Sequence, residues 1–187
     1  MIIWTCMITG FFGSFRMGEL LAEKSKTFDV QSNLTWNDIT FKKGSVKIHI
    51  KKPKSNNKNG ENVYIFPFPV KKCCPVHYLD KMKKHQMKHN VYGKNLPVFR
   101  FSSGKNVTKN DINKILETLL KSKNYSCKSF RCGIPSSIGK FPDIANDQHI
   151  KAWGRWKSNT FLRYEHGGIP QMKWVFDKIV RCLLKEI

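Results

Sequence analysis

The alternation of Val46, Ile48 and Ile50 with polar residues is the pattern that most restricts how this chain can fold. A period of two residues predicts a β-strand with one buried face. The Asn-rich segment 56–60 predicts a turn, and the apolar residues of 62–66 predict a strand that returns beside the first. The chain therefore contains one β-hairpin with lysines near its tip, around which its other elements have to pack.

Helical patterns account for most of the rest of the chain. The apolar residues 1–15 predict a buried helix, and 16–24 predict a second helix with Leu20 and Leu21 facing inward. A short strand is expected over 34–41. The remaining predicted helices are 75–89, 109–121, 143–153 and the amphipathic segment 171–187. The sequence thus predicts an α+β fold that is mostly helical and has a small antiparallel sheet.

Two local signals predict where helices begin or break. Thr108 is followed three residues later by Asp111, and this pair predicts a reciprocal capping box at the start of a helix. Pro135 is expected to interrupt the helical pattern, because proline lacks the backbone N–H that a helix interior needs. A new turn would then open at Ser136.

The composition indicates a polyanionic partner. The 187 residues are 40% hydrophobic, which is enough for one domain with a core. Lys and Arg number 34 against 13 acids, so the formal net charge is +21. Such an excess is most simply explained by nucleic acid, and the alternative is a ribosomal-type or merely soluble lysine-rich protein. A membrane partner is disfavoured, because no run is long enough to span a bilayer and no separate basic amphipathic helix is evident.

Neither a metal site nor a disulfide framework is indicated. The six cysteines include no CxxC pair and follow no regular spacing, so they predict reduced intracellular thiols. His85 and His89 are four residues apart, like a metal-binding pair, but the sequence offers no acid or third ligand beside them. We expect a solvated basic helix face at this position.

Tyr164 is the candidate nucleophile. It follows the turn Gly154-Arg155-Trp156, within a stretch rich in basic residues. A phenol has a pKa near 10 and attacks a phosphodiester only when cations and a base surround it. Three other segments supply basic residues for this purpose: 11–21, 51–55 and 128–131.

Within two of these segments the spacing places charges on one face. Arg16 and Glu19 are three residues apart, and so are Lys128 and Arg131. A surface ion pair would contribute little. Arg16, however, stands among apolar residues, where an unpaired guanidinium is costly. The neighbouring lysines at the hairpin tip are expected to be solvated; these are Lys51, Lys52 and Lys58.

Four motifs in this order resemble the catalytic domain of the tyrosine recombinase (phage integrase) superfamily, and most closely the recombinases of DIRS-type retrotransposons and Crypton transposons. They are Phe11 to Leu21, Cys74 to Val76, Ser129 to Gly133 and Gly154 to Tyr164. The resemblance covers nearly the whole chain. It implies a single catalytic domain over 1–187, without the core-binding domain that usually precedes it in the family.

The resemblance also implies a reaction and partners. Double-stranded DNA would be cleaved and rejoined through a 3′-phosphotyrosine intermediate, without metal or cofactor. Members of the family act as tetramers on paired DNA sites, and 171–187 would dock into a neighbouring protomer. A eukaryotic mobile element of this kind would act in the nucleus. The alternatives are a catalytically inactive, domesticated or degenerate DNA-binding relative, and a basic RNA-binding protein.

The resemblance assigns roles to eight residues. Arg16 and Arg131 would hold the scissile phosphate, and Glu19 would orient its neighbours. The lysine that protonates the departing 5′ oxygen would be Lys54, with Lys52 as a rival. The remaining assignments are Lys128, which would help to take the tyrosine proton; Arg155 or Trp156, which would donate a hydrogen bond to the phosphate; and Tyr164, the nucleophile. Two positions depart from the family, which usually has His or Trp where Arg155 stands and a helix where Pro135 stands.

Overall fold

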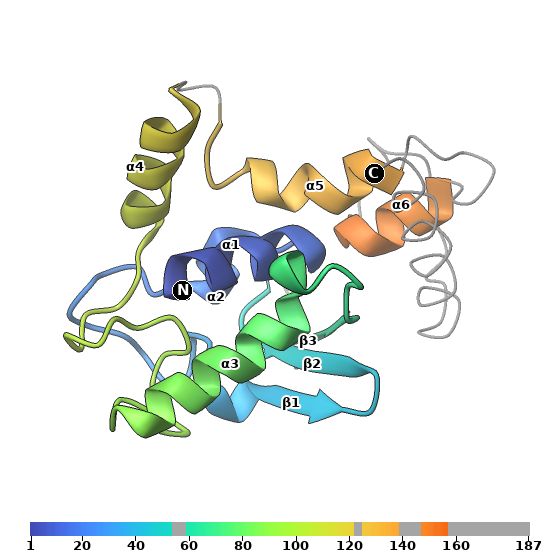
Figure 1. Ribbon diagram of the computed structural model, residues 1–187. Coiled ribbons are helices and arrows are strands. Elements are labelled where there is room, and N and C mark those ends of the chain that lie inside the picture. Colours follow the sequence, from blue (N-terminus) through green and yellow to red (C-terminus); the bar gives the residue numbers. More distant parts are fainter. Residues whose placement is uncertain (54–58, 122–124, 139–146, 157–187) are drawn as a thin grey trace.

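The residues that the computed structural model describes include three β-strands, six α-helices and two 3-10 helices. These residues are 1–53, 59–121, 125–138 and 147–156. The elements in chain order are α1 (Ile2–Phe12), α2 (Met17–Leu20), the 3-10 helix η1 (Trp36–Asp38), β1 (Ile39–Lys42), β2 (Ser45–Ile50), β3 (Glu61–Ile65), the 3-10 helix η2 (Lys71–Cys73), α3 (Pro75–Lys88), α4 (Lys109–Leu120), α5 (Ser129–Ile138) and α6 (Asp147–Gly154) (Figure 1). The predicted α+β class is confirmed, and the helix predicted over 171–187 lies outside the described residues.

The predicted hairpin is present as two strands of an antiparallel sheet with the order β1-β2-β3. Ile48 of β2 pairs with Ile39 on one side and with Val63 on the other. Val46 and Ile48 are fully buried and Ile50 is nearly so, as their alternation predicts.

The strand predicted over 34–41 begins later than expected. Thr35 donates from its backbone nitrogen and from Oγ1 to Asp38 Oδ2, at 2.7 and 2.8 Å. This capping box closes the 3-10 turn η1, so the strand starts only at Ile39. The turn also buries Trp36, whose Nε1 donates to Gln86 Oε1 of α3 at 2.7 Å.

Helix α1 occupies the middle of the fold. It packs against both α3 and α5 and lies between them in Figure 1. Its buried residues lie on several sides of the helix and include Cys6, Ile8 and Phe12, which accords with the apolar character of this segment. No helix of the described residues is long and apolar enough to cross a membrane.

The length predicted for the helix over 16–24 is wrong. α2 ends at Leu20, and Leu21 has extended backbone angles (φ −110°, ψ 145°). An extended segment can turn successive residues toward different parts of the core, and Leu20, Leu21 and Ala22 are all buried. Burial of three consecutive residues therefore outweighs the helical pattern.

The interruption predicted at Pro135 is also wrong, because α5 continues through this residue to Ile138. Proline removes the bond that its N–H would make to the Arg131 carbonyl, but α5 packs closely on α1 and on α6. The approach to α1 is tight at Gly133, where an added Cβ would lie 2.2 Å from Phe11 Cδ2. This packing brings the first turn of α5 toward the start of α2.

The predicted start of α4 is confirmed. Thr108 donates from its backbone nitrogen and Oγ1 to Asp111 Oδ2, at 2.8 and 2.7 Å, which completes the capping box. α3 begins at Pro75, as expected for proline in a first helical turn, and ends at Lys88.

Candidate functional site

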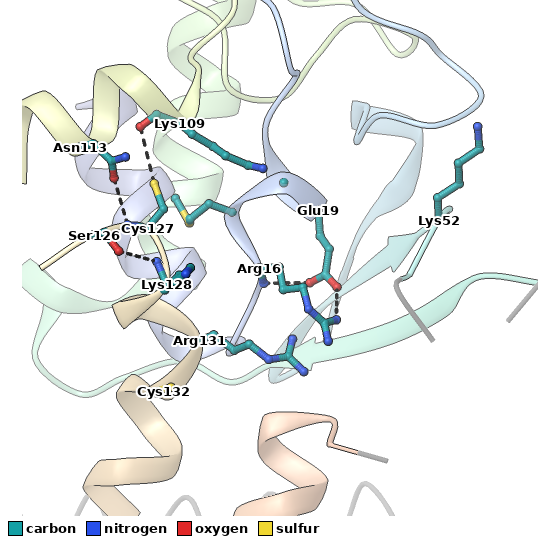
Figure 2. Close-up of a pocket in the computed structure, with 12 residues that line it drawn as sticks. Arg16, Glu19, Lys52, Lys109, Asn113, Ser126, Cys127, Lys128, Arg131 and Cys132 are labelled. Atoms are coloured by element: carbon teal, nitrogen blue, oxygen red, sulfur yellow. Dashed lines mark hydrogen bonds and ion pairs between the residues drawn. The ribbon is translucent and has the colours of Figure 1, made fainter. Parts of the chain in front are cut away.

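Charged side chains from three distant parts of the sequence meet on one side of α2. Arg16 and Glu19 come from the start of α2, Arg131 from the first turn of α5, and Arg155 from the turn that follows α6. In Figure 2 the Arg16 and Arg131 side chains extend toward one another. The structure thus brings together four of the eight residues that the resemblance singles out.

Glu19 is the centre of this arginine cluster, which comprises Arg16, Glu19, Arg131 and Arg155. Its Oε1 lies 3.1 Å from Arg16 Nη1, and its Oε2 lies 2.7 Å from Arg155 Nη2. Oε2 also accepts the Arg16 backbone N–H at 2.9 Å, as in a capping box. The side chains of Glu19 and Arg155 are only 5% and 9% exposed. One carboxylate therefore fixes two guanidinium groups, and one of these pairs is buried.

The protein itself holds Arg155 through both terminal guanidinium nitrogens, whereas its buried Nε has no hydrogen-bond partner among the described residues. Its Nη2 donates to the Ser14 carbonyl at 3.0 Å, and Nη1 lies 3.5 Å from Glu61 Oε2. Its guanidinium carbon lies 5.1 Å from the centroid of the Phe15 ring, a cation–π distance. The backbone of Arg155 is left-handed (φ 51°), and its carbonyl accepts from Arg131 Nη2 at 3.4 Å. Arg155 thus touches Glu19 with its side chain and Arg131 with its backbone.

Arg131, like Arg155, has a buried guanidinium nitrogen without a hydrogen-bond partner among the described residues. In Arg131 this nitrogen is Nη1. Burial, together with the nearby charges of Arg16 and Arg155, lowers the pKa of Arg131 to about 10. The residue stays charged at neutral pH at a cost that a bound anion would offset. An anion reaching Nη1 would satisfy both its hydrogen bond and its charge.

A cavity of about 790 Å³ opens beside Arg131 and Arg16. Five cations line it, and the acid among its lining residues is Glu19, which is already paired (Figure 2). The cations are Arg16, Lys52, Lys109, Lys128 and Arg131. The volume is in the range of ligand sites, and the lining favours an anion.

The predicted lysines differ in where they lie. Lys128 and Lys52 are exposed and line the cavity. In Figure 2 the Lys52 side chain extends away from Arg16 and Arg131. Lys54 lies outside the described residues. Sequence reasoning missed Lys109, which was treated only as part of a structural helix. Its position directly after the cap Thr108, at the N-terminal end of α4, was the available signal.

The expectation that Lys51 is solvated is wrong. Its Nζ lies 2.6 Å from Asp38 Oδ2 and donates to the carbonyls of Val30 and Asn33, at 2.8 and 3.0 Å. The Lys51 side chain is 20% exposed and that of Asp38 is 8% exposed. The buried carboxylate at η1 requires a counter-charge, and Lys51 at the end of β2 supplies it. Lys51 therefore joins the tip end of β2 to η1.

Neither Trp156 nor Tyr164, the other two predicted site residues, is found at the cavity within the described part of the chain. Trp156 is half-buried, packs against the core and does not line the cavity. Its ring lies so close to Gly154 that a Cβ there would be 2.8 Å from it. Tyr164, the predicted nucleophile, lies outside the described residues.

The His85 and His89 rings lie with their centroids 4.3 Å apart and their planes inclined by 50° at the end of α3. Within the residues whose placement is described, no three His, Cys, Asp or Glu side chains gather as metal ligands would.

Comparison of the chain with protein-family models, with curated proteins and with solved structures finds no match.

Proposed function

We propose that this protein is a tyrosine-type DNA recombinase domain, which cleaves and rejoins double-stranded DNA for the integration of a mobile element. The observation that carries the proposal is the buried, unpartnered Nη1 of Arg131 beside a cavity lined by five cations. Two guanidinium groups fixed by the fold suit the non-bridging oxygens of one phosphodiester. The order of the four motifs along the chain supports the same reaction.

In the proposed reaction Tyr164 attacks the phosphorus, and the bond to the 5′ oxygen breaks. The enzyme is then joined to the 3′ end as a phosphotyrosine, and the 5′ oxygen leaves as a hydroxyl after taking a proton from Lys52 or Lys54. Lys128 takes the tyrosine proton when its side chain is in the neutral amine form, because a charged ammonium has no lone pair to accept it. Attack by another 5′-hydroxyl reverses the step, so one ester replaces another and no external energy source is needed.

The proposal assigns different tasks to the arginines. Arg16 and Arg131 stabilise the charge that builds on the phosphate in the transition state. Arg155 positions both of them, since its side chain shares Glu19 with Arg16 and its carbonyl receives Arg131 Nη2. The proposal extends to a tetramer on paired DNA sites and to action in the nucleus.

The alternative is a DNA-binding relative that has lost the reaction. The engagement of Arg155 with Glu19, Ser14 and Glu61 favours it, because the guanidinium stands where the family has a residue that contacts phosphate. The two functions differ in a covalent intermediate, which only the recombinase forms.

The test is to incubate the protein with nicked duplexes that trap the cleaved state, denature it, and look for a covalent protein–DNA species. We expect such a species with the natural chain and with the control Tyr125→Phe, whose tyrosine is 52% exposed. Tyr164→Phe should form none while binding DNA as before. DNA binding without any adduct from the natural chain would refute the reaction and leave the inactive relative.

A further inference from the structure

A second cationic surface lies on α3, away from the cavity. His77, Lys81, Lys84 and Lys88 follow one another at spacings of four, three and four residues, which places them on one face of the helix. Lys84 is 74% exposed, and Lys81 and Lys88 are also exposed. We call these four residues the α3 stripe. At a rise of about 1.5 Å per residue they extend over roughly 16 Å.

The helix that carries the stripe is firmly attached to the core. Leu79, Met82 and Gln86 on its opposite face are fully buried. Gln86 accepts from Trp36 Nε1 at 2.7 Å and donates from Nε2 to the Val98 carbonyl at 2.9 Å. The stripe is therefore presented by a rigid element, so a binding partner has no helix to order first.

The charge of α3 has little compensation within the helix. Its 14 residues include four lysines and one acid, Asp80, which pairs with Lys84 at 2.7 Å. This exposed pair contributes little. α4 is balanced by comparison, because Asp111 and Glu117 accompany Lys109 and Lys114. Like charges that repel one another along one helix face are a cost that an external polyanion would relieve.

Aromatic rings hold two lysines of α3 at the surface. Lys83 Nζ lies 5.4 Å from the Phe41 ring centroid and 5.7 Å from that of Tyr92. Lys81 Nζ lies 5.9 Å from the Tyr78 ring centroid. Such contacts restrict long side chains while the ammonium groups keep their charge.

The α3 stripe is separate from the cavity. None of the residues that line the cavity belongs to α3. α1 packs against α3 and against α5, which carries Arg131, and lies between the two in Figure 1. The α3 stripe and the cavity are therefore separate surfaces, with α1 between the elements that carry them.

We propose that the α3 stripe binds a second DNA duplex, so that one protein molecule bridges two duplexes. Duplex DNA carries a charge about every 1.7 Å along its axis, so a segment as long as the stripe presents on the order of ten phosphates. The inference rests on the proposed function, because the first duplex occupies the cavity, but it requires no cleavage. The lysines recognise the density of phosphates, without reading the bases.

The experiment measures whether the full chain retains a labelled duplex on beads that carry a different, immobilised duplex. The natural chain should capture the labelled duplex, and so should Tyr164→Phe. The triple variant Lys81→Gln, Lys84→Gln, Lys88→Gln should lose capture by tenfold or more, on the order expected when three phosphate contacts disappear. It should still form the covalent adduct on a nicked duplex.

The matched control removes the same charge elsewhere, through Lys24→Gln, Lys26→Gln and Lys105→Gln, all at exposed positions outside the cavity lining. Gln and Lys have similar helix propensities, so the α3 variant is expected to fold, and circular dichroism verifies this. Three outcomes overturn the inference: no capture by the natural chain, equal loss in the control, or undiminished capture by the α3 variant. The last result would indicate bridging by oligomers through their cavities. Absence of the adduct from the natural chain would overturn the proposed function alone, so the two failures are distinguishable.

Discussion

The arginine cluster and the α3 stripe are both cationic, yet they are built in opposite ways. In the cluster, guanidinium groups are wholly or partly buried, and Glu19 holds those of Arg16 and Arg155. Arg131 Nη1 and Arg155 Nε have no hydrogen-bond partner among the described residues. On the stripe, ammonium groups stand in solvent on a rigid helix, and one of them pairs with an exposed acid. A buried fork with fixed direction can orient one phosphate, whereas exposed point charges give affinity without orientation.

The difference predicts which exchange of arginine and lysine is tolerated. Arg131→Lys keeps a cation but loses the planar fork, so covalent adduct formation should fall by about 10²-fold or more. The triple variant Lys81→Arg, Lys84→Arg, Lys88→Arg keeps every charge of the stripe, and duplex capture should stay near that of the natural chain. Gel quantification of the adduct and the bead assay measure the two effects. Normal adduct from Arg131→Lys would show that the fork geometry is not used.

The second prediction compares how much the buried Arg155–Glu19 pair and the exposed Lys84–Asp80 pair contribute to the stability of the fold. Glu19→Gln leaves the buried Arg155 with Glu61, at 3.5 Å, as its one acidic partner among the described residues, and should lower the free energy of unfolding by about 3 kcal/mol. Asp80→Asn removes the exposed partner of Lys84 and should cost at most about 0.5 kcal/mol. Urea titrations followed by fluorescence measure both. Equal losses from the two variants would mean that the Glu19 pair is solvated.

The third prediction concerns salt. Each lost phosphate contact makes the fall of log affinity with log salt shallower, by about 0.9 in the slope. Duplex capture by the Lys81, Lys84 and Lys88 glutamine variant should therefore show a slope smaller by about 2.7, while Arg131→Gln reduces it by about 0.9. Capture measured over a series of salt concentrations gives both values. Similar slopes for the two variants would contradict three independent contacts along the stripe.

The smallest expected effect is on cysteine reactivity. Cys132 is exposed and lines the cavity, and Cys73 lies just before α3. Burial raises the pKa of the Cys127 thiol, which also lines the cavity, so this thiol should react more slowly than Cys132. Substoichiometric duplex should protect Cys132 from iodoacetamide by about threefold, and excess duplex should then protect Cys73 by a similar factor. Simultaneous protection at every duplex concentration would indicate one binding surface.

Local signals made the fold largely predictable. The alternation that predicts β2 and the capping box at Thr108 each depend on residues close in sequence, and both are confirmed. The errors arose where distant packing decides the outcome. Burial of Leu21 and Ala22 in an extended segment ends α2 at Leu20. Packing against α1 and α6 allows α5 to continue through Pro135.

The site was predictable in its parts and not in its connections. Arg16 and Glu19 were paired from their spacing, and the structure confirms that pair. The Arg155 contact to Glu19 joins residues 136 positions apart, and nothing in the local sequence indicates it. Lys51 was misassigned for the same reason, because its partner Asp38 belongs to another element.

Gly133 has a consequence for the size of anion that the cluster can hold. Its missing side chain lets α5 approach the Phe11 ring so closely that a Cβ would lie 2.2 Å from Cδ2. Because Arg131 is two residues earlier on the same helix, this approach sets the span between its guanidinium and that of Arg16. A single methyl group at Gly133 would wedge the helices apart and move the Arg131 guanidinium relative to that of Arg16. In the proposed recombinase, the site would then suit larger anions than one phosphate.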